Sequence, residues 1–352
     1  METTIKEIGK SLGFQDIKIC DATELKSYER FYHEFIQKNH HGKMDFLEKH
    51  EILKTNPQKI VPQAKSIILV TLNYFQARKD AKNWAPKIHI PSHKEGQIAR
   101  YAFGRDYHKI FKKKLKQFSK KLEGNYKNYN ARFFADSGPL LERQYAEKSG
   151  LGYIGKNTML ITQKYGSWVL IGEIITNVKL KADKPFDREQ MVCGSCNKCQ
   201  IACPTGALYE DYKINASKCI SYLTIEHKGN IPLELREKIG SWLFGCDICQ
   251  EVCPHNFRSQ ETTIIDFKNA IAGEKQILKK ILNIKDDKEF LQLFAGSPLM
   301  RGKRINLIRN ACIVAANLNR DDLIKEIEKL SYNNNEIIKE HAIWALQKLK
   351  KK

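Results

Sequence analysis

The residues with the clearest chemical meaning in this sequence are cysteines. Eight of the ten fall between Cys193 and Cys253, and the first four follow the spacing Cys-x2-Cys-x2-Cys-x3-Cys-Pro. Thiolates at this spacing ligate paired [4Fe-4S] clusters, with three holding one cluster and the fourth reaching to the other. A zinc ribbon uses two Cys-x2-Cys pairs, so it would need neither the third closely spaced cysteine nor the Cys-Pro. The pattern therefore predicts two [4Fe-4S] clusters.

The second cysteine group, "CDICQEVCP", lacks its first cysteine because Leu243 stands at that position. Cys219 is the cysteine left in the region that can complete the set. Exchanging the fourth cysteine between the two groups then supplies eight thiolates for two cubanes. The predicted ligands are Cys193, Cys196, Cys199 and Cys253 for the first cluster, and Cys203, Cys219, Cys246 and Cys249 for the second.

Two clusters in one chain indicate electron transfer, but they do not show which reaction uses the electrons. The chain could be a ferredoxin-like carrier that serves another protein. A carrier, however, needs neither residues 1–180 nor a helical segment after the cysteines. The length therefore favours an enzyme that uses the electrons in its N-terminal part.

Segment 1–180 has the pattern of an α/β domain. Apolar, β-rich stretches occupy 66–75, 131–136 and 167–176. Apolar residues at 107–122 recur with helical spacing, and lysines fill other positions. These lysines form either a solvated helix face or a surface that faces phosphate.

Composition changes twice more along the chain. The polar stretch 181–191, which contains Pro185, indicates a domain boundary before the cysteines. From Pro298 onward the sequence predicts short amphipathic helices that resemble a helical-repeat pair. The predicted organisation is an α/β domain at 1–180, a ferredoxin-like double-cluster domain at 181–265 and an α-helical, HEAT-like repeat at 266–352. Because one helix pair cannot bury its own apolar face, we expect it to dock on the rest of the chain.

The overall charge favours a polyanionic partner. The 352 residues include 60 Lys and Arg and 40 Asp and Glu, which gives a net charge of +20. Such an excess of positive charge suits binding to nucleic acid, but an AT-rich genome also increases the lysine content. The sequence contains no signal-peptide pattern and no run of about 18 apolar residues, so we expect a cytoplasmic protein without a membrane partner. The isolated Cys20 and Cys312 are expected to be small buried hydrophobic residues.

Asp136 has two possible roles. It follows the apolar stretch 131–136 and precedes a helical pattern, so it could cap that helix. It could instead be a proton donor in a cleft at the carboxyl end of a strand, where α/β ligand sites gather. Upstream, "DYH" at 106–108 resembles the start of the Asp-x-His-x-x-Gly signature of cobalamin ligation, but Phe111 replaces the glycine. Any cobalamin is therefore expected to be bound base-off, without that histidine ligand.

The chain resembles the epoxyqueuosine reductases. The matching blocks occur in order over residues 50–350: "GRDYHKI", "ADSGPLLERQYAEKSGLGYIGKNTMLIT", "YGSWVLIGEIITN", "CGSCNKCQIACPTGAL", "CISYLTIEHKG", "GCDICQEVCPHN" and "SPLMRGKRINLIRNA". That family reduces epoxyqueuosine at the tRNA wobble position to queuosine, with cobalamin and two [4Fe-4S] clusters. The resemblance implies that 1–180 binds cobalamin and that 266–352 binds tRNA.

The chemistry that the resemblance implies fits these residues. Removing an epoxide oxygen as water takes two electrons and two protons, and clusters deliver electrons singly. A positioned acid must protonate the oxygen when the ring opens. The family's proton donor aligns with Asp136.

The resemblance also implies contact residues. The positions that align with cobalamin contacts are Lys54, Ala99, Asp136, Leu160, Thr162, Ile171, Ser221 and Asp247, and ordinary core packing is the alternative for each. Lys54 is a departure, because the family often has arginine there and lysine lacks its planar fork. Phosphate contacts to tRNA are expected from Arg301, Lys303, Arg304 and Arg309, which could otherwise be surface charges on a helix.

Two other functions remain possible on the sequence. A reductive dehalogenase shares cobalamin and clusters but is usually exported, which the absent signal peptide and basic tail disfavour. An electron carrier would contain no cobalamin. For a reductase of this family we expect two partners, a tRNA carrying epoxyqueuosine as the substrate and an external low-potential electron donor. We also expect the protein to act as a monomer.

Overall fold

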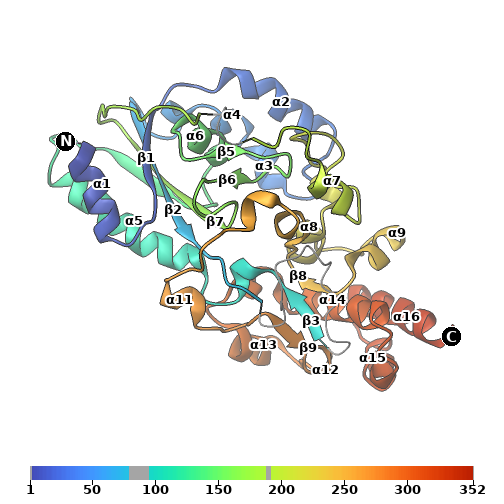
Figure 1. Cartoon of the computed structure of the whole chain (residues 1–352). Helices are drawn as coiled ribbons and strands as arrows, with labels where there is room; N and C mark the ends of the chain where they lie inside the picture. The colour runs from blue at the N-terminus through green and yellow to red at the C-terminus, as the bar shows by residue number, and fades with distance from the viewer. Residues whose placement is uncertain (1, 79–94, 188–191, 352) are drawn as a thin grey trace.

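The computed structural model describes residues 2–78, 95–187 and 192–351, so 188–191 of the predicted boundary segment lie outside the described residues. Its centre is a four-stranded sheet in the order β1-β2-β7-β4 (Figure 1). The strands are β1 (Ile17–Asp21), β2 (Ser66–Asn73), β4 (Ala131–Phe134) and β7 (Val169–Thr176). The three apolar stretches predicted to be strands are therefore confirmed as β2, β4 and β7.

Helices cover both faces of this sheet, which is why every residue of β2 is buried rather than every second one. Ile68, Val70 and Leu72 pack with α1 (Glu2–Ser11) and α5 (Tyr107–Glu123) on one face. On the opposite face, alternate residues such as Ile67 and Leu69 pack with α6 (Glu142–Lys148). In Figure 1, α1 and α5 lie on one side of the sheet and α6 on the other. The predicted helix at 107–122 is α5.

Two details differ from expectation. All pairings in the central sheet are antiparallel, so the rule that places ligands at the carboxyl ends of parallel strands does not apply to Asp136. Strands buried on both faces look alike in the two sheet types, and their sequence does not specify direction. In addition, α6 begins at Glu142 with Leu141 as its N-cap. The N-cap interpretation of Asp136 is therefore wrong, because the residue lies in the turn after β4.

Short elements surround the cysteines. A second sheet has the order β8-β3-β9 and contains β3 (Glu95–Ile98), β8 (Trp242–Phe244) and β9 (Lys275–Ile277), and β5 (Tyr153–Ile154) pairs with β6 (Leu160–Ile161). The remaining short helices are α2 (Lys26–Gln37), α3 (Asp45–Lys49), α4 (Glu51–Lys54), α7 (Lys198–Ala202), α8 (Ile220–Ile225), α9 (Leu233–Arg236), α10 (Ile248–Glu251) and α11 (Ile265–Lys268). The cysteines thus lie on loops and helix ends, as cluster ligands commonly do.

The C-terminal part is helical. It consists of α12 (Leu278–Leu282), α13 (Asp287–Phe294), α14 (Lys303–Asn317), α15 (Ile324–Leu330) and α16 (Glu336–Lys350). One continuous apolar core joins Ile98 and Leu243 with Leu307 of α14 and Ala345 of α16. The helices therefore dock on the rest of the chain as expected. The HEAT-like classification and the three domain boundaries stay predictions.

Two further expectations concern burial and length. Cys20 and Cys312 are fully buried among apolar residues, as predicted. Among the described residues, none of the helices combines the length and the apolar composition that crossing a bilayer requires.

Candidate active site

Asp136 lies in a strained turn that presents its carboxylate outward. Its φ of +58° is in the left-handed region, which non-glycine residues seldom occupy, and 59% of its side chain is exposed. The Tyr107 hydroxyl at the start of α5 donates a hydrogen bond to Asp136 Oδ2, and His108 Nε2 lies 3.9 Å from the same oxygen. Strain of this kind is frequent at functional sites, where the surrounding structure must hold it.

Neighbouring elements hold this turn through its backbone. The Asp136 N–H donates to Glu142 Oε2 of α6 at 3.3 Å. Lys54 Nζ, at the end of α4, donates to the Gly138 carbonyl at 3.3 Å. Helices α4, α5 and α6 therefore all contact the turn that carries Asp136.

Acidic and basic side chains are concentrated beneath this turn. Burial lowers the pKa of Lys54, while Glu142 and Glu173 act in the opposite direction. Burial and the nearby Asp136 raise the pKa of Glu142 to about 7. Burial, with Glu142 and Asp136 as neighbours, raises the pKa of Glu173 well above its ordinary value. Two carboxyl groups whose raised pKa values disfavour ionisation therefore lie beneath the turn.

Tyr101 connects the Asp136 turn with the cysteine-bearing segment. Its ring centroid lies 6.0 Å from that of Tyr107 and 6.3 Å from that of Phe244 in β8. Burial raises the pKa of Tyr101 well above its ordinary value, and the charges of Asp136 and Asp247 add to this effect. The phenol therefore stays neutral.

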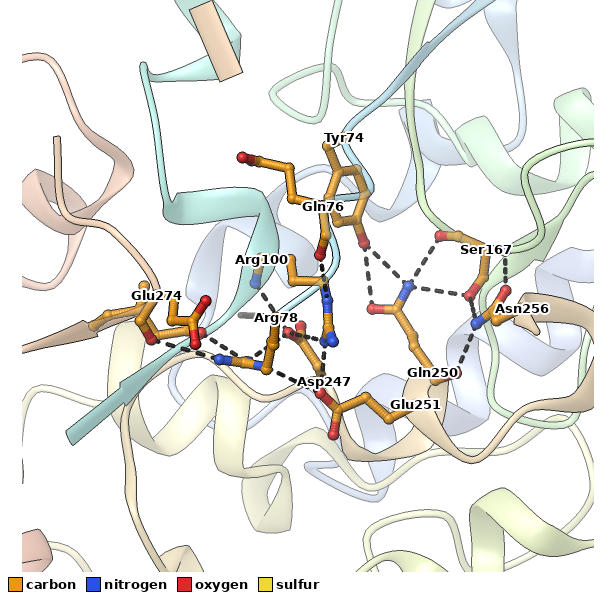
Figure 2. Close-up of polar contacts among 11 residues, drawn as sticks. Tyr74, Gln76, Arg78, Arg100, Ser167, Asp247, Gln250, Glu251, Asn256 and Glu274 are labelled. Carbon is orange, nitrogen blue, oxygen red and sulfur yellow. Dashed lines mark hydrogen bonds and ion pairs between the residues drawn. The ribbon is translucent and has the colours of Figure 1, made fainter. Parts of the chain in front are cut away.

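A buried charged network joins the N-terminal part to α10 (Figure 2). Asp247 Oδ2 accepts from the Arg100 backbone N–H at 2.9 Å, from Arg100 Nη1 at 3.1 Å and from Arg78 Nη2 at 3.2 Å. Glu251 Oε1 accepts from Arg100 Nη1 at 2.6 Å and from Arg78 Nε at 3.3 Å. Nearby, the Gln250 amide donates to Tyr74 and Ser167. The network fixes α10, whose flanks carry Cys246 and Cys253.

The predicted cobalamin positions fall into separate groups. Lys54 of α4 contacts the turn that carries Asp136, as described above. Ala99 lies against Gly245, where an added Cβ would stand 2.5 Å from the Ala99 Cβ, so this pair is close to Asp247. The Asp247 side chain is 2% exposed, and its Oδ2 atom accepts from two arginines.

The other four positions are less distinctive. Leu160 and Ile171 pack in the core on the α6 face of the sheet. The Thr162 hydroxyl donates to the Gly166 carbonyl at 3.1 Å, and Ser221 is half-buried in α8. These contacts agree with ordinary packing, so cobalamin binding by these residues stays a prediction.

The cysteines assemble into two neighbouring groups. Burial raises the pKa of Cys253 to about 11, and Cys193, Cys199 and Cys196 add to the increase as close neighbours. Cys249 has Cys219, Cys199 and Cys203 as charged neighbours, and Cys246 has Cys219 and Cys249.

These neighbours correspond to the two predicted ligand sets, with Cys199 close to both. Within the described part of the chain, no three His, Cys, Asp or Glu side chains converge on a single metal ion. The assignment of individual ligands stays a prediction.

The predicted tRNA contacts divide into surface and core residues. Arg301 is 60% exposed and pairs with Glu226 at 2.8 Å, Lys303 is exposed, and Arg304 pairs with Asp287 at 2.9 Å. Asp136 is a charged neighbour of Arg301, which places this arginine near the Asp136 turn.

Arg309, by contrast, is fully buried. Its guanidinium donates to the carbonyls of Leu223, His227 and Gly229, and burial lowers its pKa to about 9. The predicted phosphate contact of Arg309 is therefore wrong, because the side chain cannot reach an RNA backbone.

Two family models match the chain. The 4Fe-4S double cluster binding domain matches residues 192–256, and the family described as "Epoxyqueuosine reductase QueG, DUF1730" matches residues 54–137. The fold and the cysteine groups therefore define an iron–sulfur oxidoreductase with a double-cluster segment.

Relatives specify the family. The chain is 36% identical over 342 residues to the epoxyqueuosine reductase of Escherichia coli, covering 97% of this chain and 88% of the relative. It is 36% identical over 348 residues to that of Pseudomonas aeruginosa, covering 98% and 93%. The chain belongs to the epoxyqueuosine reductase family and is a reductase.

Solved structures agree with this assignment. An epoxyqueuosine reductase crystallised with a tRNA-Tyr stem loop modified with epoxyqueuosine superposes with a TM-score of 0.88 at 32% identity, covering 99% of this chain and 90% of that chain. The Streptococcus thermophilus enzyme has a TM-score of 0.86 at 30% identity, covering 100% and 91%. A Bacillus subtilis epoxyqueuosine reductase superposes with a TM-score of 0.87 at 32% identity, covering 99% of this chain and 90% of that chain. In that structure a catalytic loop named for its aspartate is swung out of the active site.

Proposed function

We propose that this protein reduces epoxyqueuosine at the wobble position of tRNA to queuosine, with Asp136 as the proton donor. The observation that carries this proposal is the outward-facing Asp136 carboxylate, held by Tyr107 in a strained turn, within a chain of this family. A loop with a catalytic aspartate in the Bacillus subtilis relative supports the same role for the Asp136 turn.

The electrons would come from two [4Fe-4S] clusters and cobalamin. Cys193, Cys196, Cys199 and Cys253 would hold one cluster and Cys203, Cys219, Cys246 and Cys249 the other, in agreement with their grouping. The match to a double-cluster domain supports this arrangement. An external low-potential donor would supply the clusters with single electrons.

Bound cobalamin would supply a strongly reduced cobalt for two-electron reduction of the epoxide. His108 fits base-off binding, because its Nδ1 lies 2.8 Å from Asp106 Oδ1 and its Nε2 faces Asp136. Both ring nitrogens therefore face carboxylates. Lys54 and Asp136 at the turn, Ala99 and Asp247 near Gly245, and Leu160, Thr162, Ile171 and Ser221 would contribute the remaining contacts.

The substrate would bind across exposed and half-buried basic residues of the C-terminal part. Arg301, Lys303 and Arg304 would contact phosphates, and the complex of a relative with a tRNA stem loop supports such an RNA as the substrate. Because Asp136 and Arg301 are neighbours, a phosphate held by Arg301 would bring the anticodon loop to the proton donor. The wobble base would turn out of its stack to reach the site, as is usual for enzymes that act on bases. We further propose that the protein acts as a monomer in the cytoplasm, with three domains at 1–180, 181–265 and 266–352.

Mass spectrometry of tRNA nucleosides tests the reaction. Anaerobically purified protein with verified clusters and cobalamin should convert epoxyqueuosine to a product lighter by one oxygen atom when a low-potential reductant is added. Asp136→Asn should bind both cofactors and leave the epoxide unreduced, while the exposed control Asp321→Asn should behave as wild type. Full activity in Asp136→Asn would contradict the role of Asp136, and an unchanged epoxide in the loaded wild-type protein would contradict the reaction.

A further inference from the structure

The proposed reaction consumes two protons, and this inference rests on that proposed function. A single carboxyl group carries one proton, so Asp136 must be protonated again within each turnover. A protein group that reloads it faster than solvent would have to lie next to the turn and hold a proton near neutral pH. The structure contains side chains with these properties on the inner side of the turn.

Glu142 is in direct contact with the residue that it would reload. Its Oε2 atom accepts the hydrogen bond from the Asp136 backbone N–H at 3.3 Å, and Asp136, after burial, contributes to the raised pKa of Glu142. Glu142 is half-buried at the start of α6, where Arg143 is the adjacent cation.

Glu173 lies behind Glu142, in the centre of the sheet. It occurs in β7 between Leu69 of β2 and Phe134 of β4, and it alternates with Ile171 and Ile175, so its side chain belongs to the α6 face. It is fully buried, and neither carboxylate oxygen has a hydrogen-bond partner among the described residues. An isolated buried carboxylate is costly, so the carboxyl group is expected to be protonated.

The backbone of the turn fits closely over this pair. A Cβ atom added to Gly138 would lie 2.8 Å from Glu173 Oε1, so the turn contacts the carboxyl group at the one residue that has no side chain. Lys54, which binds the Gly138 carbonyl, is the cation that faces both glutamates. On the outer side, Tyr107 and His108 face Asp136 itself.

We propose that Glu142 and Glu173 form a proton reservoir beneath the Asp136 turn, and that Glu142 returns a proton to Asp136 between the two protonation steps of each turnover. In this transfer the O–H bond of the Glu142 carboxyl breaks and an O–H bond forms on the Asp136 carboxylate, with no change in electron count. Glu173 and solvent then protonate Glu142 again. Lys54 limits the negative charge that remains while Glu142 is ionised.

The alternative is that Glu142 only holds the turn by accepting a hydrogen bond. Glu142→Gln separates the two roles, because the amide oxygen still accepts the Asp136 N–H while the amide cannot carry a transferable proton. A holding role predicts normal turnover in this variant. The reservoir predicts a loss of about tenfold, below the usual effect of a general acid, because solvent also reaches the exposed Asp136.

The pH profile provides a second criterion. Glu142 loses its proton as the pH rises through about 7, so turnover of the wild-type holoenzyme should fall over that range. Glu142→Gln should be slow at all these pH values and should lack this decline. Glu123→Gln, the same change on the exposed end of α5, is the matched control and should keep the wild-type rate and profile. A wild-type rate and profile in Glu142→Gln would overturn the proposal.

Infrared spectroscopy of the holoenzyme provides a criterion that does not depend on turnover. The C=O stretch of a protonated carboxyl group should disappear as the pH rises through about 7 in the wild type, and Glu142→Gln should lack this band. In Asp136→Asn the band should persist but titrate at lower pH, because a neighbouring negative charge is gone. A titrating band that is unaffected in both variants would overturn the proposal.

The two proposals can fail separately. Full activity in Asp136→Asn would refute the proton donor. An inactive Asp136→Asn together with a fully active Glu142→Gln would leave Asp136 as the donor and refute the reservoir.

Discussion

The Tyr107 hydroxyl donates a hydrogen bond to the Asp136 carboxylate and links the first turn of α5 to the turn after β4. Tyr107 is buried, and burial raises its pKa well above the ordinary value, with the charge of Asp136 as the next cause. The phenol therefore remains a neutral donor at any physiological pH. This contact fixes the direction in which the strained turn presents its carboxylate.

Removing this hydroxyl should reduce turnover without unfolding the protein. In Tyr107→Phe the ring still packs while Asp136 loses the contact that orients it, so we expect kcat to fall by about tenfold. The stability cost should stay near 1 kcal/mol, since the Asp136 side chain is largely exposed. Turnover assays and thermal melts check both parts. A wild-type kcat with intact cofactors would show that Tyr107 does not position Asp136.

The charged network of Figure 2 should be needed to retain the clusters. Arg100→Met leaves Asp247 and Glu251 with one arginine between them, and breaking a buried ion pair typically costs about 3–5 kcal/mol. We expect a lower Tm and a lower iron and sulfide content per chain, because α10 lies between Cys246 and Cys253. Arg105→Met removes a half-exposed pair with Asp266 and is the control, with little expected effect. Equal iron content in the two variants would contradict a role in holding the clusters.

Much of the fold could be predicted from local pattern. The stretches at 66–75 and 167–176 are mostly apolar because both faces of the central sheet are covered, and 107–122 has the spacing of a helix with one buried face. Strand direction could not be predicted in this way, because a strand buried on both faces has the same sequence in a parallel or an antiparallel sheet. The cysteine spacing indicated clusters because ligand geometry constrains sequence directly.

The residues that sequence reasoning missed are charges in apolar surroundings. Glu173 is the one charged residue in the eight-residue strand β7, and a carboxylate at such a position signals a special environment. The phosphate contact predicted for Arg309 was wrong because this arginine also lies in apolar surroundings. It occurs in "INLIRNACIVAAN", where apolar residues on all sides indicate a buried helix. Arg78, Arg100 and Tyr101 belong to no motif, and only the tertiary fold brings them to the site.

Acid should destabilise the protein through His341. This residue of α16 is fully buried, its Nε2 accepts the Ile231 N–H at 3.1 Å, and burial lowers its pKa to about 3. The unfolded chain, with a histidine pKa near 6.5, binds a proton in the range where the folded chain does not. Stability is therefore full above about pH 6.5 and declines as the pH falls toward 3, by at most about 1.4 kcal/mol per pH unit.

His341→Gln should weaken this dependence. The Tm of the wild type should drop more between about pH 7 and about pH 5 than that of the variant, because glutamine does not titrate. Parallel pH profiles of Tm would show that His341 is not the group responsible.

The last prediction separates the two kinds of arginine in the C-terminal part. Arg301→Ala removes an exposed charge beside Asp136, so binding of a tRNA anticodon stem loop should weaken, and the slope of log K against log salt should fall by about 1. Its Tm should stay close to that of the wild type. Lys325→Ala, an exposed charge on α15, is the control and should change neither quantity if the RNA is held near Asp136.

Arg309→Ala should show the opposite pattern. Three carbonyl groups, those of the buried Leu223 and His227 and of the half-buried Gly229, lose their donor, so stability should fall by about 3 kcal/mol or more. Any folded variant should keep the wild-type salt slope, because the removed charge never reached the surface. Binding measured over a salt series, beside thermal melts, distinguishes the cases. A reduced slope in Arg309→Ala with unchanged Tm would restore Arg309 as a phosphate contact and contradict its buried role.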